Sequence, residues 1–157
     1  MKKSTLIYII MLLAVIAAAW YISRTRYQLL MINGDSMEPA YSSGTLVFID
    51  RRPGELRAGD VALFRCEGLG CDLVKRVVAL PGDSVHIDGG RLYVNAQIPD
   101  SPQGAAYIAE AGLAGTELTV PEGCCFVMGD DLAGSVDSRD ARVGFVRLSD
   151  IIGRIID

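Results

Sequence analysis

The chain has 157 residues, 50% of them hydrophobic, which is enough to bury one modest core but not two independent ones. All of its 19 acidic residues lie at or after Asp35, whereas four of its 15 basic residues lie before Tyr27. Residues 27–157 therefore carry 19 acidic against 11 basic residues, a formal charge of −8. This balance, with few clustered Lys and Arg, argues against a nucleic-acid partner.

An uncharged segment opens the chain. Residues 4–23 contain no charged side chain, and as an α-helix they would span about 30 Å, the thickness of a bilayer's hydrocarbon core. Trp20 and Tyr21 are typical of the headgroup interface. Lys2, Lys3 and the amino terminus give three positive charges before the segment, and Arg24 and Arg26 give two after it, which favours a cytoplasmic N-terminus. We therefore predict a membrane anchor over residues 1–26 and an extracytoplasmic domain over residues 27–157.

Two other interpretations of this segment stay open. A basic start, the apolar residues 6–16 and the three alanines at 17–19 also have the order of a removable signal peptide, although the apolar run continues to residue 22. The second alternative interpretation is a buried core helix, but so long an uncharged stretch at the N-terminus fits that role poorly. Both the anchor and the signal peptide place the rest of the chain outside the cytoplasm.

Short apolar runs separated by turns make up most of the remaining sequence. Its Gly- and Pro-containing turns favour antiparallel hairpins over βαβ units, so we predict a mainly β domain. The predicted strands are residues 45–50, 60–66, 72–80, 84–87, 91–94, 124–128 and 151–155.

Two further segments fit this pattern less well. The apolar residues 29–32 are expected either to form a first core strand or to face lipid or a cleft. Residues 99–115, rich in Ala, Gly and Pro, are expected to form an irregular, lid-like loop.

The cysteines and the single histidine limit the chemistry of any site. Cys66 and Cys71 flank a Gly-rich turn, so they are candidates for a hairpin disulfide, with two free thiols as the alternative. Adjacent Cys124 and Cys125 would point to opposite faces of a strand, and the spacing is not that of a zinc site. We predict no metal and no other cofactor. His86 lies in an alternating segment, typical of a strand residue rather than a catalytic base.

The tripeptide Gly-Asp-Ser occurs twice, at residues 34–36 and 82–84, and only the first continues into Met-Glu-Pro. Residues 34–39 (GDSMEP) resemble the nucleophile box of bacterial type I signal peptidases. Three further segments resemble the later motifs of this family and occur in the family's order: residues 59–64 (GDVALF), 74–83 (VKRVVALPGD) and 129–139 (GDDLAGSVDSR). Together with the anchor, these motifs cover nearly the whole chain.

The resemblance implies a serine endopeptidase with Ser36 as nucleophile and Lys75 as general base, on an antiparallel β-sheet or partial barrel of the signal peptidase type. Elementary chemistry agrees, because a lysine can replace histidine as base if burial lowers its pKa. Lys75 is the one lysine after the anchor and has apolar neighbours. The backbone N–H of Ser36 would belong to the oxyanion hole. Gly34 offers no side chain for a second donor, which therefore stays open.

Supporting roles also follow from the resemblance. It implies that Ser135 orients the lysine amine, that Asp137 pairs with Arg139, and that Asp130 anchors Arg76. Without the resemblance, the acidic residues of this segment would form a charged loop, and an aspartic dyad among them is disfavoured.

The implied function is the removal of signal peptides from exported preproteins that carry small residues before the cleavage site, at the cell membrane. The substrate would bind as an extended strand at a sheet edge. Only residues 83–121 separate the lysine box from the last strand, so the chain resembles the minimal, single-domain type, which conjugation-associated pilin peptidases share. That branch stays open, as do a non-catalytic membrane-tethered assembly module and a self-cleaving Ser-Lys regulator. The intact serine and lysine argue against the module, and the anchor argues against the regulator.

Overall fold

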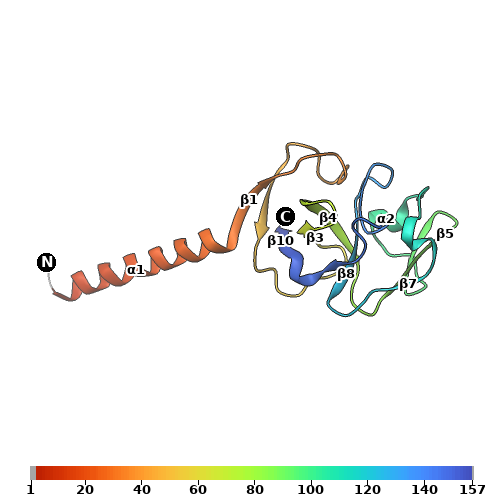
Figure 1. Cartoon of the computed structure of the whole chain (residues 1–157). Coiled ribbons are helices and arrows are strands. Elements are labelled where there is room, and N and C mark those ends of the chain that lie inside the picture. The colour runs from red at the N-terminus through yellow and green to blue at the C-terminus, as the bar shows by residue number, and fades with distance from the viewer. Residues whose placement is uncertain (1–2, 157) are drawn as a thin grey trace.

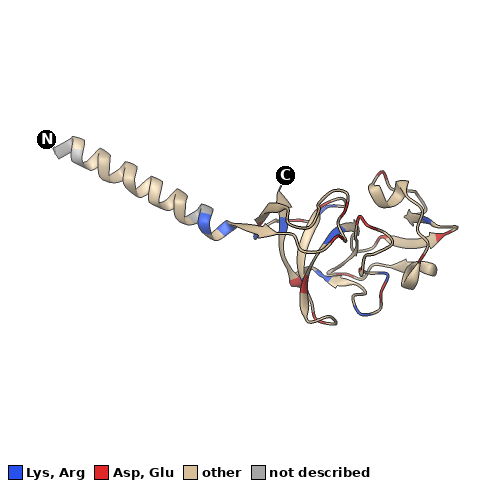
Figure 2. Ribbon diagram, turned by 90° about the horizontal axis from the view of Figure 1, so that it is seen from above, with Lys and Arg blue, Asp and Glu red and all other residues tan. Residues whose placement is uncertain are grey.

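A computed structural model describes residues 3–156, in which a long helix, α1 (Lys3–Arg26), projects from a β domain (Figure 1). The apolar span Ile7–Arg26 lies wholly outside the core of the β domain. Figure 2 shows basic residues in blue at the C-terminal end of the helix, whose last turn contains Arg24 and Arg26. By length and composition this helix can cross a membrane. Residues 1–2 of the predicted anchor lie outside the described residues.

Two antiparallel sheets build the β domain. The larger sheet has seven strands in the order β1-β2-β10-β3-β4-β8-β9, and the smaller has three in the order β6-β5-β7. The strands of the larger sheet are β1 (Tyr27–Met31), β2 (Leu46–Asp50), β3 (Val61–Cys66), β4 (Cys71–Ala79), β8 (Cys124–Met128), β9 (Val146–Arg147) and β10 (Ile151–Ile156). Those of the smaller sheet are β5 (Ser84–Asp88), β6 (Arg91–Val94) and β7 (Leu118–Thr119). The prediction of a mainly β fold with one N-terminal apolar helix is confirmed.

The predicted strands all overlap observed ones, with ends that differ by one residue at most. Two strands were not predicted, β7 and β9, because two residues are too few to show an alternating pattern. The segment 99–115 is more ordered than expected. It contains the short helix α2 (Pro102–Ala105), capped by the Ser101 hydroxyl, which accepts a hydrogen bond from Gly104 N, and a 3₁₀ turn, η1 (Gly112–Gly115). A second 3₁₀ turn, η2 (Leu148–Asp150), precedes β10.

The apolar segment 29–32 turns out to be mostly an edge strand. Leu29 and Met31 are exposed, Leu30 is half-buried, and Ile32 is buried just after the strand. The core-strand alternative does not hold for Leu29 and Met31, and β1 pairs only with β2 among the described strands. Leu30, Met31 and Ile32 line a cleft, in agreement with the second alternative.

A buried apolar cluster supports the loop that follows β1. It consists of Ile32, Met37, Val47, Val61 and Ile155. Each such buried side chain contributes about 1.5–3 kcal/mol relative to exposure. Met37 directly follows Ser36, so the cluster fixes one side of the predicted nucleophile.

Candidate active site

Ser36 and Lys75, which are 39 residues apart in sequence, meet in the structure. The Lys75 amine donates a hydrogen bond to the Ser36 hydroxyl, with 2.6 Å between Nζ and Oγ. Lys75 lies on β4, opposite Ala62 of β3, and Ser36 lies in the loop between β1 and β2. A serine in contact with a lysine is the arrangement that nucleophilic catalysis needs where no histidine is near.

The Ser36 loop is held from two sides. Met37 anchors it in the core, and the backbone N–H of Asp131 donates to the Ser36 carbonyl at 3.2 Å. Gly34 has φ +92°, a left-handed conformation that a residue with a side chain adopts only under strain. Glycine here therefore serves the turn, and the serine is positioned by both of its flanks.

Burial sets the protonation behaviour of Lys75. The side chain is only 2% exposed, and this burial is the largest cause that lowers the lysine pKa below its usual value. The Asp137 carboxylate opposes the effect, Arg139 adds to it, and Asp130 and Asp131 oppose it more weakly. The neutral amine, the form that can accept a proton from serine, is therefore populated at a lower pH than in an exposed lysine.

The Asp137–Arg139 pair lies next to this dyad. Two parallel bonds of 2.8 Å join the guanidinium to the carboxylate, which is fully buried. The same carboxylate accepts from Gly129 N at 3.0 Å, and Arg139 also donates to the Leu132 carbonyl at 2.9 Å. The pair thus fixes the chain on both sides of the segment that contacts Ser36.

A second buried pair joins β4 to the same segment. Arg76 donates to Asp130 through Nε at 2.9 Å and Nη2 at 2.6 Å, and its third nitrogen donates to the Gly59 carbonyl at 2.8 Å. The structure therefore brings together the Asp130–Arg76 and Asp137–Arg139 partners that the resemblance implied.

Sequence reasoning missed Gln103. This fully buried side chain on α2 donates to Asp130 Oδ1 at 2.5 Å and to the Gly129 carbonyl at 3.3 Å. It ties the segment 99–115 to the active-site chain. A lone glutamine in an irregular, Ala- and Gly-rich stretch gives no signal that could have identified it; the Ser-Pro start of its helix marks only a cap.

Ser135 does not make the hydrogen bond that the resemblance implied. Its hydroxyl is buried, has no hydrogen-bond partner among the described residues and lies against Gly129. A side chain at Gly129 would collide with both this hydroxyl and the Ser36 carbonyl. The hydrogen bond from Ser135 to the Lys75 amine that the resemblance implied is therefore not formed, although the Ser135 hydroxyl and the Ser36 carbonyl both lie against Gly129.

A cleft of about 360 Å³ opens beside the dyad. Ser36 and Lys75 line it together with Gln28 and residues 30–33 and 72–74. Strand β4 pairs with β8 only from Arg76 onward, so the backbone of residues 71–75 has no strand partner on that side among the described strands. Such an open edge can accept an extended peptide through main-chain hydrogen bonds.

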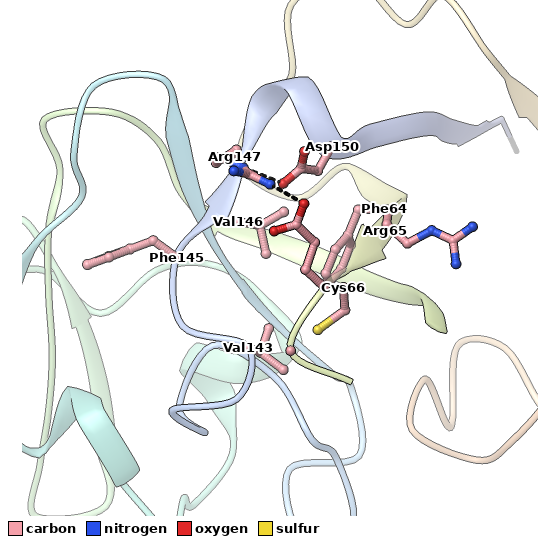
Figure 3. A pocket seen from close by; sticks show the side chains of 10 residues that line it. Phe64, Arg65, Cys66, Val143, Phe145, Val146, Arg147 and Asp150 are labelled. Carbon is pink, nitrogen blue, oxygen red and sulfur yellow. Dashed lines mark hydrogen bonds and ion pairs between the residues drawn. The ribbon is translucent and has the colours of Figure 1, made fainter. Parts of the chain in front are cut away.

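The predicted Cys66–Cys71 disulfide is not formed, and both thiols are free. The two residues are directly opposite in the β3–β4 register. The Cys66 thiol, however, is buried and contacts the Arg142 carbonyl at 3.7 Å, whereas Cys71 is exposed. Cys66 lines a separate pocket of about 300 Å³, which contains neither Ser36 nor Lys75 and is bordered by Arg147 and its partner Asp150 (Figure 3).

The other titratable candidates, His86 and Cys125, lie in surroundings that give them no catalytic role. His86 lies on β5 and stacks on Tyr93 with 4.8 Å between ring centroids, as expected for a strand residue. Burial raises the pKa of Cys125 to about 12, so its thiol stays protonated. Within residues 3–156 no three His, Cys, Asp or Glu side chains form a group that could hold a metal ion.

Replacing Asp137 with Asn is expected to destabilise the protein by about 3–5 kcal/mol, because the buried Arg139 guanidinium would lose its counter-charge. Urea unfolding of the detergent-solubilised protein measures this. The control is Asp140→Asn, which removes an exposed pair with Arg142 and should change the unfolding midpoint little. Equal midpoints for the two variants would contradict the structural role of Asp137.

Comparison with known proteins agrees with this site. Residues 4–156 match the family model described as signal peptidase, peptidase S26. The chain is 33% identical to signal peptidase I U of Bacillus subtilis, over 98% of this chain and 88% of that protein. It is 34% identical to signal peptidase I of Bacillus caldolyticus, over 80% and 75% of the two chains. Among solved structures, a signal peptidase I from Enterococcus faecalis superposes with a TM-score of 0.53 at 28% identity, covering 66% of this chain and 99% of that one.

Proposed function

Because the chain belongs to the signal peptidase family, peptidase S26, and is a serine endopeptidase that removes signal peptides, we propose that Ser36 is its nucleophile and Lys75 its general base. The observation that carries this assignment is the 2.6 Å hydrogen bond from a buried lysine amine to a serine hydroxyl beside an open cleft.

The chemistry proceeds in two halves. Neutral Lys75 takes the Ser36 proton as Oγ attacks the scissile carbonyl carbon, and the Ser36 N–H stabilises the resulting oxyanion. The tetrahedral intermediate collapses when the ammonium returns the proton to the departing amine, which frees the mature protein and leaves the signal peptide as an ester on Ser36. Water then attacks the ester as Lys75 takes its proton, and the same proton returns to Oγ as the peptide leaves as a carboxylic acid.

The two buried ion pairs have a positioning role in this proposal. Asp137 with Arg139 and Asp130 with Arg76 hold the chain segment whose Asp131 N–H bonds the Ser36 carbonyl. Their charges also tune the amine, because the carboxylates favour the ammonium and Arg139 disfavours it. Rigid support of this kind keeps the reacting atoms in the productive geometry.

The cleft indicates how a signal peptide binds. Its end would lie extended along the free edge of residues 71–75, so that alternate side chains point into the cleft. Apolar residues such as Leu30, Ile32 and Val74 line this space, which suits small side chains at the first and third positions before the scissile bond. The partners are thus exported preproteins with small residues at these positions.

We also propose that α1 is a retained single-pass anchor with the N-terminus in the cytoplasm and residues 27–157 outside. The helix length supports a membrane span, and the three positive charges before the apolar segment, against two after it, support the cytoplasmic N-terminus. The exposed side chains of Leu29, Met31, Leu46 and Phe48 continue the apolar surface beyond the helix, which supports a domain held at the bilayer.

The proposed function is tested with two preproteins that differ at one residue, alanine or leucine directly before the cleavage site. The alanine substrate is expected to yield a mature protein that begins after that residue, and the leucine substrate to react about 100-fold more slowly, because the larger side chain does not fit the apolar cleft. Product N-termini and kcat/KM are measured in detergent. No cleavage of the alanine substrate would refute the function, and equal cleavage of both would refute the size selection.

The same assay reports orientation. In sealed inside-out membrane vesicles, a preprotein added from outside should be cut only after detergent opens the vesicles, because the catalytic domain would face the lumen. Cleavage without detergent would contradict the extracytoplasmic location of residues 27–157.

A further inference from the structure

The membrane helix passes into the β domain without a linker. Helix α1 ends at Arg26 and β1 begins at Tyr27 (Figure 1). Tyr27 is already paired with Asp50 of β2, and the N–H of Arg51 donates to the Arg26 carbonyl at 2.8 Å. The last helical residue is therefore bonded to the domain through its backbone.

The side chain of Arg26 makes a second connection at the same point. Its Nε donates to both carboxylate oxygens of Asp50, at 3.0 and 3.1 Å, and Nη2 donates to one of them at 2.6 Å. Arg24, two residues earlier in the helix, instead lies over the Trp20 ring. One of the two basic residues at the outer end of the helix thus bonds the domain, while the other contacts the helix itself.

The Asp50 carboxylate is held in a fixed position. Its side chain is only 5% exposed, it accepts a further hydrogen bond from Arg52 N at 2.9 Å, and Arg154 is its neighbour in the β2–β10 register. The Arg26 side chain remains 43% exposed, so the free-energy cost of desolvating its guanidinium in this contact is small. A fork-shaped bond to a fixed, buried carboxylate restricts orientation far more than a bond between two mobile surface side chains.

The position of this junction matters for the cleft. Strand β1 runs from the junction to the loop that carries Ser36, and Leu30, Met31 and Ile32 line the cleft on the way. A rotation between Arg26 and Tyr27 would therefore tilt the cleft relative to the bilayer. A signal peptide held in the membrane arrives at one height and angle, so a misplaced cleft lowers the fraction of productive encounters.

We propose that the Arg26–Asp50 bond is a rigid joint between α1 and the catalytic domain, and that it positions the cleft for substrates that are themselves in the membrane. The inference rests on the proposed function of the same chain. Arg26 and Asp50 are positioning residues, because neither lines the cleft nor contacts Ser36 or Lys75.

The test compares two substrates in one preparation of the full chain in nanodiscs. Arg26→Gln and Asp50→Asn are expected to lower kcat/KM about tenfold for a membrane-inserted preprotein and less than about twofold for a soluble peptide that spans the cleavage site. The matched control is Arg24→Gln, which removes the same charge two residues earlier in the helix and should leave both values within about twofold. An equal loss on both substrates, or an unchanged value for the preprotein, would overturn the proposal.

The distance between a label on α1 and a label on the β domain tests the rigid joint independently of activity. One spin label is placed at Leu12→Cys and the other on the exposed native Cys71, with the other three cysteines replaced by alanine. The full chain should give one narrow distance distribution, and Arg26→Gln should broaden it while Arg24→Gln does not. An unchanged distribution in Arg26→Gln would refute the joint even if the peptidase activity is confirmed. A broadened one would support the joint even if no cleavage were observed.

Discussion

Replacing Ser36 with alanine is expected to lower kcat/KM for a preprotein by at least about 10⁴-fold while the fold stays intact. The hydroxyl of Ser36 accepts the hydrogen bond from Lys75 and faces the cleft, so its removal deletes the nucleophile. The neighbouring Met37 stays packed in the core, and the Ser36 carbonyl still accepts from Asp131 N. The measurement is the rate of mature-protein formation in detergent at saturating and subsaturating substrate.

The chain supplies its own matched control, because Gly-Asp-Ser occurs a second time. Ser84 begins β5 in the smaller sheet, where its N–H donates to the Asn95 side chain at 2.9 Å. Ser84→Ala should keep kcat/KM within about twofold of wild type. Equal processing by Ser36→Ala and wild type would remove Ser36 from the mechanism.

Replacing Lys75 with arginine is expected to lower kcat by about 10³–10⁴-fold, because a guanidinium stays protonated and cannot accept the Ser36 proton. Because arginine is larger than the buried lysine, Lys75→Met, which suits an apolar environment, serves as the second variant and should lose as much activity. The double variant Ser36→Ala, Lys75→Met should be no slower than either single variant, as expected for residues that act as a unit. Near wild-type kcat in Lys75→Arg would refute the serine-lysine mechanism and direct attention to His86.

The pH profile gives the same mechanism a second test. Activity requires the neutral amine, so kcat/KM should fall as the pH drops through the Lys75 pKa. Because burial lowers this pKa, the acid limb should lie below 10.5, the ordinary value for lysine. Asp131 acts in the opposite direction, so Asp131→Asn should move the acid limb to lower pH. An acid limb that shifts upward in this variant would contradict the electrostatic assignment.

Much of the architecture follows from local sequence signals. The uncharged run at residues 4–23 predicts α1 because length and polarity alone decide whether a helix can span a bilayer. Alternating apolar residues between turns predict β4 and β8 to within one residue of their observed ends. The resemblance of the ordered motifs to the signal peptidase boxes pairs Ser36 with Lys75, and the structure brings the two side chains into contact.

The tertiary structure alone decided how these residues are surrounded. Whether Lys75 is buried, and so has a lowered pKa, depends on how β4 packs against distant segments. The contacts of Gln103 with Asp130, and of Arg26 with Asp50, join residues 27 and 24 positions apart. The spacing of these residues in the sequence does not predict such contacts. The sequence also does not show that the Ser135 hydroxyl lies against Gly129 without a hydrogen bond to the lysine amine. Residue types and periodicity predict the longer elements, whereas the two-residue strands, burial and long-range hydrogen bonds depend on how the elements pack in space.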